Sequence, residues 1–97
     1  MEDLIKKVEN WAVDKGINSH VNWPKQFAKV VEELGELSSA MLKDKPDEEI
    51  DAFGDVLVTL IILAMQRGVN LEAALNAAYL EIAGRTGTTV GGVFVKS

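Results

Sequence analysis

The feature that most constrains this chain is the apolar run VLVTLIILAM, residues 56–65, which follows the segment DAFGD. If residues 47–67 form one helix, the second half of that helix carries apolar side chains in nearly every direction. Such a helix has to be covered on all sides. The run is too short to cross a bilayer as a helix. Because four short helices in 97 residues can hardly cover it, we expect a second subunit to complete the fold.

Helical spacing of apolar residues predicts an all-α protein with one domain, residues 1–97. The predicted helices cover about residues 3–15, 24–42, 47–67 and 71–83. Gly16 stands where a helix commonly ends, Pro24 fits a first turn, and Asn70 is a suitable N-cap. Residues 84–97 are rich in Gly and Thr and end in VFV, so we expect a short extended or β-like tail.

Charge and composition exclude several classes of function. The net charge of −5 and the pI of about 4.8 argue against nucleic acid and anionic membranes, which both attract basic surfaces. The chain has no cysteine, which excludes disulfides, thiolate metal sites and thiol nucleophiles. The N-terminus is amphipathic and lacks the pattern of a signal peptide. We therefore expect a soluble cytoplasmic protein, and a phosphate ligand would need a metal ion to approach it.

The segment EELGE places three carboxylates on one side of the predicted helix 24–42. Residues three and four apart on a helix are neighbours, so Glu32, Glu33 and Glu36 cluster. They point roughly opposite to the apolar side of the same helix. Taken alone, such a cluster is usually a solvated helix face.

A column of acidic residues on the next predicted helix favours a metal site over a solvated face. Glu48, Asp51 and Asp55 are spaced i, i+3, i+7 on the helix 47–67, and the column continues into Val58 and Ile62. We therefore expect it to lie beside covered surface, where a carboxylate is costly unless it is paired or binds a metal. Carboxylates from two helices suit an oxygen-only site for Mg²⁺ or Mn²⁺.

These residues resemble a known family. EELGE followed by DAFGDVLVTLIILA is similar to the MazG-like nucleoside triphosphate pyrophosphohydrolases of the all-α NTP pyrophosphatase superfamily, over residues 23–86. The family pattern is E-E-x-x-E on one helix and E-x-x-D on the next. The resemblance implies a four-helix, MazG-like bundle completed by oligomerisation, as a dimer or a dimer of dimers. It also implies metal-dependent hydrolysis of an NTP or dNTP to monophosphate and pyrophosphate, for nucleotide-pool control, with Mg²⁺ or else Mn²⁺.

The resemblance assigns roles to the acids one by one. Glu33 and Glu36 match the first metal-binding pair, and Glu32 is the extra leading glutamate. Asp55 matches the aspartate of the second pair. Glu32 or Glu33 would orient or deprotonate the attacking water.

One position departs from the family pattern. Where the second pair should have its glutamate, this chain has Ala52. Asp51 lies one turn before Asp55, so we expect it to replace the missing ligand, with Glu48 as the second choice.

The residues assigned to the nucleotide are Trp23, Lys25, Gln26, Lys29, Asn76 and Arg85. Trp23 would stack on a base, although packing beside Pro24 is an alternative. Lys25 or Lys29 would meet phosphate, although Lys29 also has Glu33 four residues on as a partner. Arg85 matches a basic residue that follows the last helix in relatives, and a solvated tail is the competing interpretation.

Three alternatives stay open. A dUTP- or dCTP-preferring pyrophosphatase of the same superfamily is the nearest. A phosphoribosyl-ATP pyrophosphohydrolase is less favoured, because the motif is closer to the MazG-like pattern. A non-enzymatic helical oligomerisation module, whose acids only keep it in solution, comes from a different class.

Overall fold

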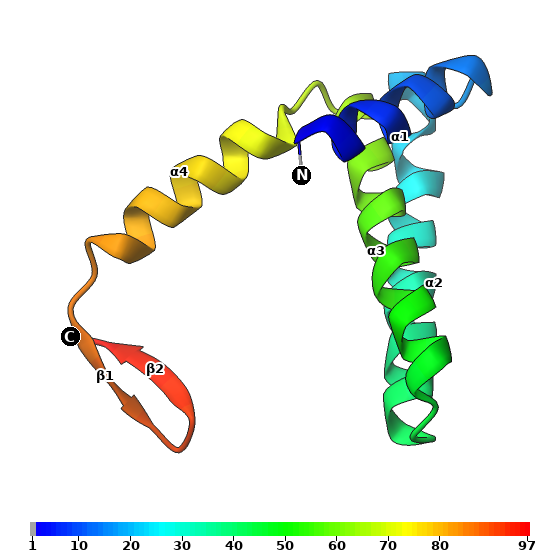
Figure 1. Cartoon of the computed structure of the whole chain (residues 1–97). Coiled ribbons are helices and arrows are strands. Elements are labelled where there is room, and N and C mark those ends of the chain that lie inside the picture. The colour runs from blue at the N-terminus through cyan, green and yellow to red at the C-terminus, as the bar shows by residue number, and fades with distance from the viewer. Residues whose placement is uncertain (1) are drawn as a thin grey trace.

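The computed structural model describes residues 2–97, and its elements follow the predicted order (Figure 1). They are α1 (Glu2–Asp14), η1 (His20–Asn22, a 3₁₀ turn), α2 (Trp23–Leu42), α3 (Pro46–Gln66), α4 (Leu71–Ala83), β1 (Gly87–Val90) and β2 (Val93–Lys96). The predicted all-α class with four helices is confirmed. The predicted β-like tail is a two-stranded antiparallel hairpin, which pairs Gly87 with Lys96 and Val90 with Val93.

Local chemistry explains where the helices begin and end. The Asn70 side chain caps α4 by accepting a hydrogen bond from the Ala73 amide at 2.9 Å, as predicted. Proline stands in the first turn of both α2 and α3, where its missing N–H costs nothing. Gly16 and Gly68 follow α1 and α3 with φ of 71° and 69°, a conformation that favours glycine.

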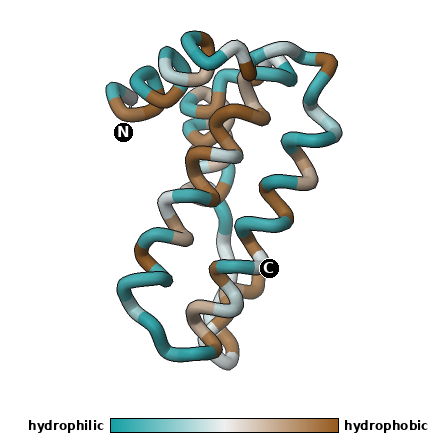
Figure 2. The backbone as a smooth tube through the Cα atoms, turned by 90° about the vertical axis from the view of Figure 1, so that its right-hand side faces the viewer, coloured by the Kyte–Doolittle hydropathy of each residue, from teal (hydrophilic) through white to brown (hydrophobic). Residues whose placement is uncertain are grey.

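The core is the seam between α2 and α3, which run antiparallel side by side (Figure 1). Val30, Leu37 and Ala40 of α2 are buried there, as are Ala52 and Ile62 of α3. Helix α1 crosses the second half of α3, where Figure 2 shows the longest hydrophobic stretch of the chain.

A buried glutamine ties the segment after α1 to this core. Gln66 Nε2 donates a hydrogen bond to the Ile17 carbonyl at 2.9 Å. Because both partners are part-buried, the bond is shielded from water and fixes the end of α1 against α3.

Helix α4 leaves the other three at a bend of 105° from α3. We call residues 71–97 the arm. Figure 1 shows the arm and the α2–α3 pair as two legs of an arch, and every residue from 72 to 97 is exposed. The radius of gyration is 16.0 Å, against about 13 Å for a compact chain of this length. Within one chain the fourth helix therefore does not join a bundle.

By length and hydropathy, none of the helices within residues 2–97 could cross a membrane singly. Only α3 and α4 taken together satisfy that test, as a pair bent by 105°.

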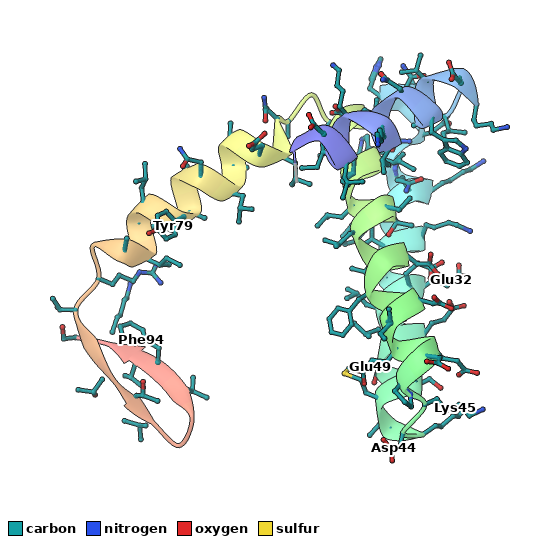
Figure 3. All side chains as sticks on the ribbon, in the orientation of Figure 1. Glu32, Asp44, Lys45, Glu49, Tyr79 and Phe94 are labelled. Atoms are coloured by element: carbon teal, nitrogen blue, oxygen red, sulfur yellow. The ribbon has the colours of Figure 1, made fainter. Side chains whose placement is uncertain are left out.

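The inner side of the arch is apolar and uncovered. Its large side chains are 46–53 % exposed, and we call this set the apolar face: Phe27, Val31, Leu34 and Met41 of α2 with Phe53 and Leu57 of α3. Glu49 lies one turn before Phe53, and Figure 3 shows it on the side of α3 that faces the arm. Figure 3 places Glu32 on the opposite side. One chain therefore leaves much of α3 uncovered, as the apolar run predicted.

Candidate functional site

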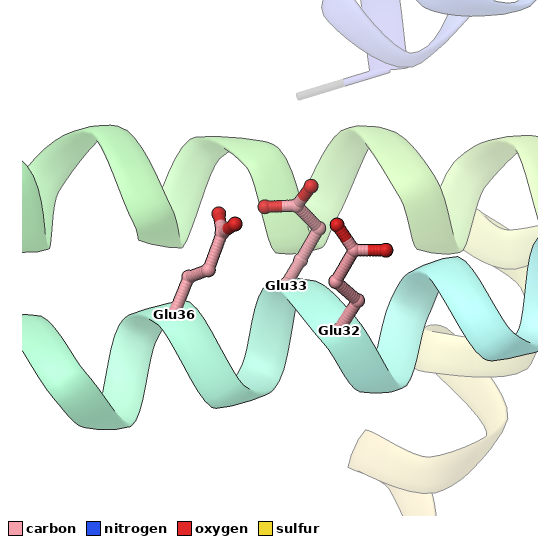
Figure 4. Close-up of side chains that lie close together, drawn as sticks. All are labelled: Glu32, Glu33 and Glu36. Carbon is pink, nitrogen blue, oxygen red and sulfur yellow. The ribbon is translucent and has the colours of Figure 1, made fainter.

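The three glutamates of EELGE converge on the outer side of the α2–α3 pair. One carboxylate oxygen each from Glu32, Glu33 and Glu36 can be chosen so that all lie within 4.8 Å of one another. Figure 4 shows the three side chains leaving α2 on the same side, toward α3. We call this set the acidic cluster. Helical spacing alone brings its members together, since they occupy one turn of α2.

Glu33 is the member of the acidic cluster whose charged form the fold destabilises. Its Oε2 atom is buried and has no hydrogen-bond partner within the described residues. Burial raises the pKa of Glu33 above its ordinary value, the adjoining Glu36 carboxylate raises it further, and Asp55 and Glu32 add to this. A partly buried carboxylate among like charges is stabilised by a proton or by a cation.

Carboxylates from α3 extend the acidic cluster. A hollow of about 300 Å³ lies next to it, lined by Glu36, Ser39, Ala40, Glu48, Asp51, Ala52 and Asp55. The antiparallel pairing of α2 and α3 sets the second acidic column opposite the first. Ala40 and Ala52 are buried at the seam, and their small side chains leave the space that the hollow occupies.

The expectation about this column is confirmed only in part. Ile62, at the end of the column, is buried, but Glu48, Asp51 and Asp55 themselves are exposed in one chain. Val58, one turn after Asp55, lines a separate hollow with Lys7, Val8 and Trp11 of α1. Lys45 Nζ lies 3.7 Å from the Glu48 carboxylate, which is a solvated ion pair. The desolvation that favours a cation therefore rests on Glu33 of α2.

At the start of α2, Trp23 contacts Arg67, a residue that was not predicted from the sequence. The Arg67 guanidinium carbon lies 4.8 Å from the centre of the Trp23 ring, a cation–π contact. No motif marks Arg67, because only the antiparallel pairing of α2 with α3 brings it to Trp23. Gln26 Nε2 donates to the Thr59 carbonyl at 3.0 Å, so this amide helps to hold α2 against α3.

The remaining predicted nucleotide residues are separated. Lys25 and Lys29 are exposed on α2, and Lys29 stands one turn before Glu33. The ion pairs found among residues 2–97 involve Lys45 and Arg85, so Lys29 and Glu33 are not paired here.

Asn76 and Arg85 lie on the arm, away from the acidic cluster of their own chain (Figure 1). Arg85 Nη2 contacts the Glu81 carboxylate at 3.1 Å. If these two residues meet a nucleotide held at an acidic cluster, that cluster belongs to another copy of the chain.

Comparison with known proteins identifies the family of this chain. The sequence profile of the phosphoribosyl-ATP pyrophosphohydrolase family matches residues 2–79, well over half of the chain. The chain belongs to this family. Phosphoribosyl-ATP pyrophosphohydrolases are part of the MazG-like all-α NTP pyrophosphatase superfamily, so the resemblance holds at the level of the superfamily. The preference for the MazG branch over the phosphoribosyl-ATP branch is not supported by this match.

The match to the phosphoribosyl-ATP pyrophosphohydrolase family includes every acid of the site and ends within α4. A protein of Haemophilus phage HP1, described as an uncharacterized 18.2 kDa protein in the rep-hol intergenic region, is 41% identical over 70 residues. That alignment covers 72% of this chain and 43% of the phage protein, so the chain spans less than half of its relative's length. No solved structure matches the chain.

Proposed function

We propose that this protein hydrolyses a nucleoside or deoxynucleoside triphosphate between the α and β phosphates, releasing a monophosphate and pyrophosphate. Nucleotide-pool control is the role that such a reaction would serve. The observation that carries the proposal is the buried, unpartnered Glu33 oxygen inside a cluster of carboxylates. Membership of a pyrophosphohydrolase family supports the choice of bond.

The acids of the site fit a hard divalent cation. All candidate donors are oxygens, which suit Mg²⁺ or Mn²⁺, and the orphaned Glu33 oxygen lacks the partner that a cation would supply. Glu33, Glu36, Asp51 and Asp55 would hold the ion, with Glu48 as the second choice for Asp51. When bound, it would neutralise phosphate charge and lower the pKa of a bound water.

Glu32 is the best placed group to act on the attacking water. It is exposed, while its carboxylate stays within the acidic cluster. It can therefore accept a proton from water beside the cation site without leaving its own helix turn. Glu33 would share this role only through an oxygen that the cation leaves free.

The start of α2 would bind the rest of the nucleotide. The Trp23 ring, held on one side by Arg67, offers a flat surface to a base. Lys29 lies on the acidic side of α2 and would contact phosphate, as would Lys25 nearer the helix start.

Phosphoribosyl-ATP is the second candidate substrate, and the family match favours it. It contains the triphosphate of ATP, so the same acids would act on the same bond. The two candidates differ only in whether the base end of the site accepts an added phosphoribosyl group.

A single assay tests the reaction and separates these substrates. The protein is incubated with each of the eight common NTPs and dNTPs and with phosphoribosyl-ATP, in Mg²⁺ or in EDTA. We expect pyrophosphate with at least one substrate, and only with metal. Orthophosphate as the product, or no product with any substrate, would contradict the proposal.

We also propose that the active form contains a second copy of the chain. One copy exposes 7288 Å², whereas a compact protein of 10.6 kDa exposes about 5,500 Å². The excess of about 1,800 Å² is larger than the roughly 800 Å² that each partner of a standard interface buries. The apolar face and α4, both uncovered, are the surfaces that would meet in a dimer or in a dimer of dimers.

A further inference from the structure

The C-terminal hairpin carries its own uncovered surface, outside the family match. Cross-strand partners share a face, so Val90 and Val93 lie on one side with Thr88 and Val95. We call this side the valine face; its three valines are 50–66 % exposed. An isolated two-stranded hairpin is only marginally stable in water. The valine face therefore needs a partner surface.

The other side of the hairpin borders a hollow beside α4. Phe94 lines a hollow with Tyr79 and Ile82 of α4. A Cβ added at Gly87 would lie 2.8 Å from the Phe94 ring, so the ring packs closely over this glycine. Figure 3 shows Phe94 and Tyr79 on neighbouring parts of the arm. The Phe94 side of the hairpin thus faces α4 across this hollow, and the valine face is on the opposite side.

The arm has the length needed to follow the whole α2–α3 pair of a second copy. The 13 residues of α4 extend about 20 Å, and the four-residue strands add about 13 Å. The 20 residues of α2 extend about 30 Å. If α4 lies along the apolar face of a second copy, the hairpin reaches one end of that face.

The net charge of the hairpin and the charges at the two ends of the α2–α3 pair indicate which end the hairpin reaches. Residues 84–97 contain Arg85 and Lys96 and no acid, a net charge of +2. Residues 43–49, at the α2–α3 turn, contain two lysines and four acids, a net charge of −2. The opposite end of the pair is basic, with Lys25, Lys29 and Arg67 within or beside the helix ends. The hairpin is therefore complementary to the turn and not to the start of α2.

We propose that the hairpin of one copy docks on the α2–α3 turn of a second copy, with the valine face over Met41 and Phe53. Lys96 lies on the opposite side of the hairpin from the valine face, so it contributes to the net charge of the hairpin and not to a direct contact under the valines. The docking rests on the second copy proposed above. It also brings the basic tail to the end of the α2–α3 pair where Asp51 and Glu48 stand.

Because the chain has no cysteine, single cysteines can test this contact without background. Two differently tagged chains, Met41→Cys and Val93→Cys, are co-expressed and treated with a bismaleimide. We expect a cross-linked species that carries both tags. Val21→Cys, near the start of α2, replaces Met41→Cys as the control and should give little cross-linking. Stronger cross-linking through position 21 would overturn the proposed orientation.

A second measurement uses the whole chain with valines replaced by threonine, which keeps the branched shape. We expect Val93→Thr with Val95→Thr to weaken the dimer at least 10-fold in sedimentation equilibrium, and Val13→Thr on α1 to leave it unchanged. Equal dimer affinity in the double variant would overturn the docking. A wild-type chain that stays monomeric would overturn the docking and the second copy together. Absence of pyrophosphate with cross-linking intact would contradict only the proposed reaction.

Discussion

The α2–α3 pair has two long faces that a single chain leaves incomplete in different ways. On the outer side, the acidic cluster and the α3 column hold negative charge, with one buried oxygen that has no partner. On the inner side, the apolar face is about half exposed and carries no charge among its members. On the proposals above, the first face would bind a cation and the second would bind another copy of the chain.

On the proposals above, one seam supports two kinds of binding. The α2–α3 core is narrow, and its buried positions include the small residues Ala40 and Ala52. Small side chains let the helices approach, which sets carboxylates of α2 against those of α3. The larger side chains remain on the inner side, where one chain leaves them about half exposed. A change on one face should therefore leave the binding at the other largely intact.

The largest effect is expected from removing one carboxylate of the acidic cluster. Glu36→Gln should lower pyrophosphate release about 10²- to 10³-fold, because it removes a preorganised charge from the cation site. Its dimer affinity should stay the same, which sedimentation equilibrium can check. Glu72→Gln on α4 makes the same charge change and should keep full activity. Dissociation of Glu36→Gln into monomers would show that the two faces are not independent.

The complementary change is made on the apolar face. Leu57→Glu should weaken the dimer about 100-fold, because a charge would be buried at the interface. The mass of the particle in solution measures this. Leu4→Glu places the same charge on an exposed leucine of α1 and should leave the dimer intact. If Leu57→Glu stays dimeric, the apolar face is not the interface.

Divalent cations should stabilise the folded chain through the outer face alone. At a Mg²⁺ or Mn²⁺ concentration 100 times the Kd, the gain is about 2.7 kcal/mol. For a chain of this size that corresponds to a rise in Tm of about 10 °C. Leu57→Glu should keep this rise and Glu36→Gln should lose it. A rise that is equal in both variants would place the cation elsewhere.

A smaller effect distinguishes Asp51 from Glu48 as the residue that replaces the family's glutamate at position 52. Asp51→Asn should reduce pyrophosphate release about 10-fold, as expected for the loss of one of several ligands, and Glu48→Gln should do less. Steady-state rates at saturating Mg²⁺ make the comparison. Full activity in Asp51→Asn together with a loss in Glu48→Gln would reverse the assignment.

The smallest effect concerns the pH dependence of stability without metal. Because burial and like charge raise the pKa of Glu33, the folded state holds its proton more tightly than the unfolded state. In EDTA this contribution is complete below the ordinary glutamate pKa, and is lost as the pH rises through the raised pKa. Glu33→Gln should remove that loss in urea unfolding at stepped pH. Parallel curves for the two proteins would contradict the assigned burial.

The local parts of this structure could be predicted from the sequence. Helical spacing and the positions of Pro24 and Asn70 place the helices to within a residue or two. The acidic cluster follows from spacing within one helix turn. Such features depend on neighbours along the chain, and one sequence contains that information.

The parts that depend on distant contacts could not be predicted. Nothing in the sequence shows that α4 turns away from α3, or that Glu48, Asp51 and Asp55 are exposed within one chain. The contact of Arg67 with Trp23 needs the register of two antiparallel helices. Ala52 looked like a lost ligand, whereas the structure shows it buried at the seam, beside the hollow that the acids line.

The central claim is that the outer face holds a divalent cation among carboxylates of both helices. Crystals grown with Mn²⁺ test it directly, through an anomalous difference map collected near the manganese absorption edge. We predict a peak between α2 and α3 that is bounded by Glu33, Glu36 and Asp55. A map without a peak at the acidic cluster, or with manganese bound only elsewhere, would contradict the account.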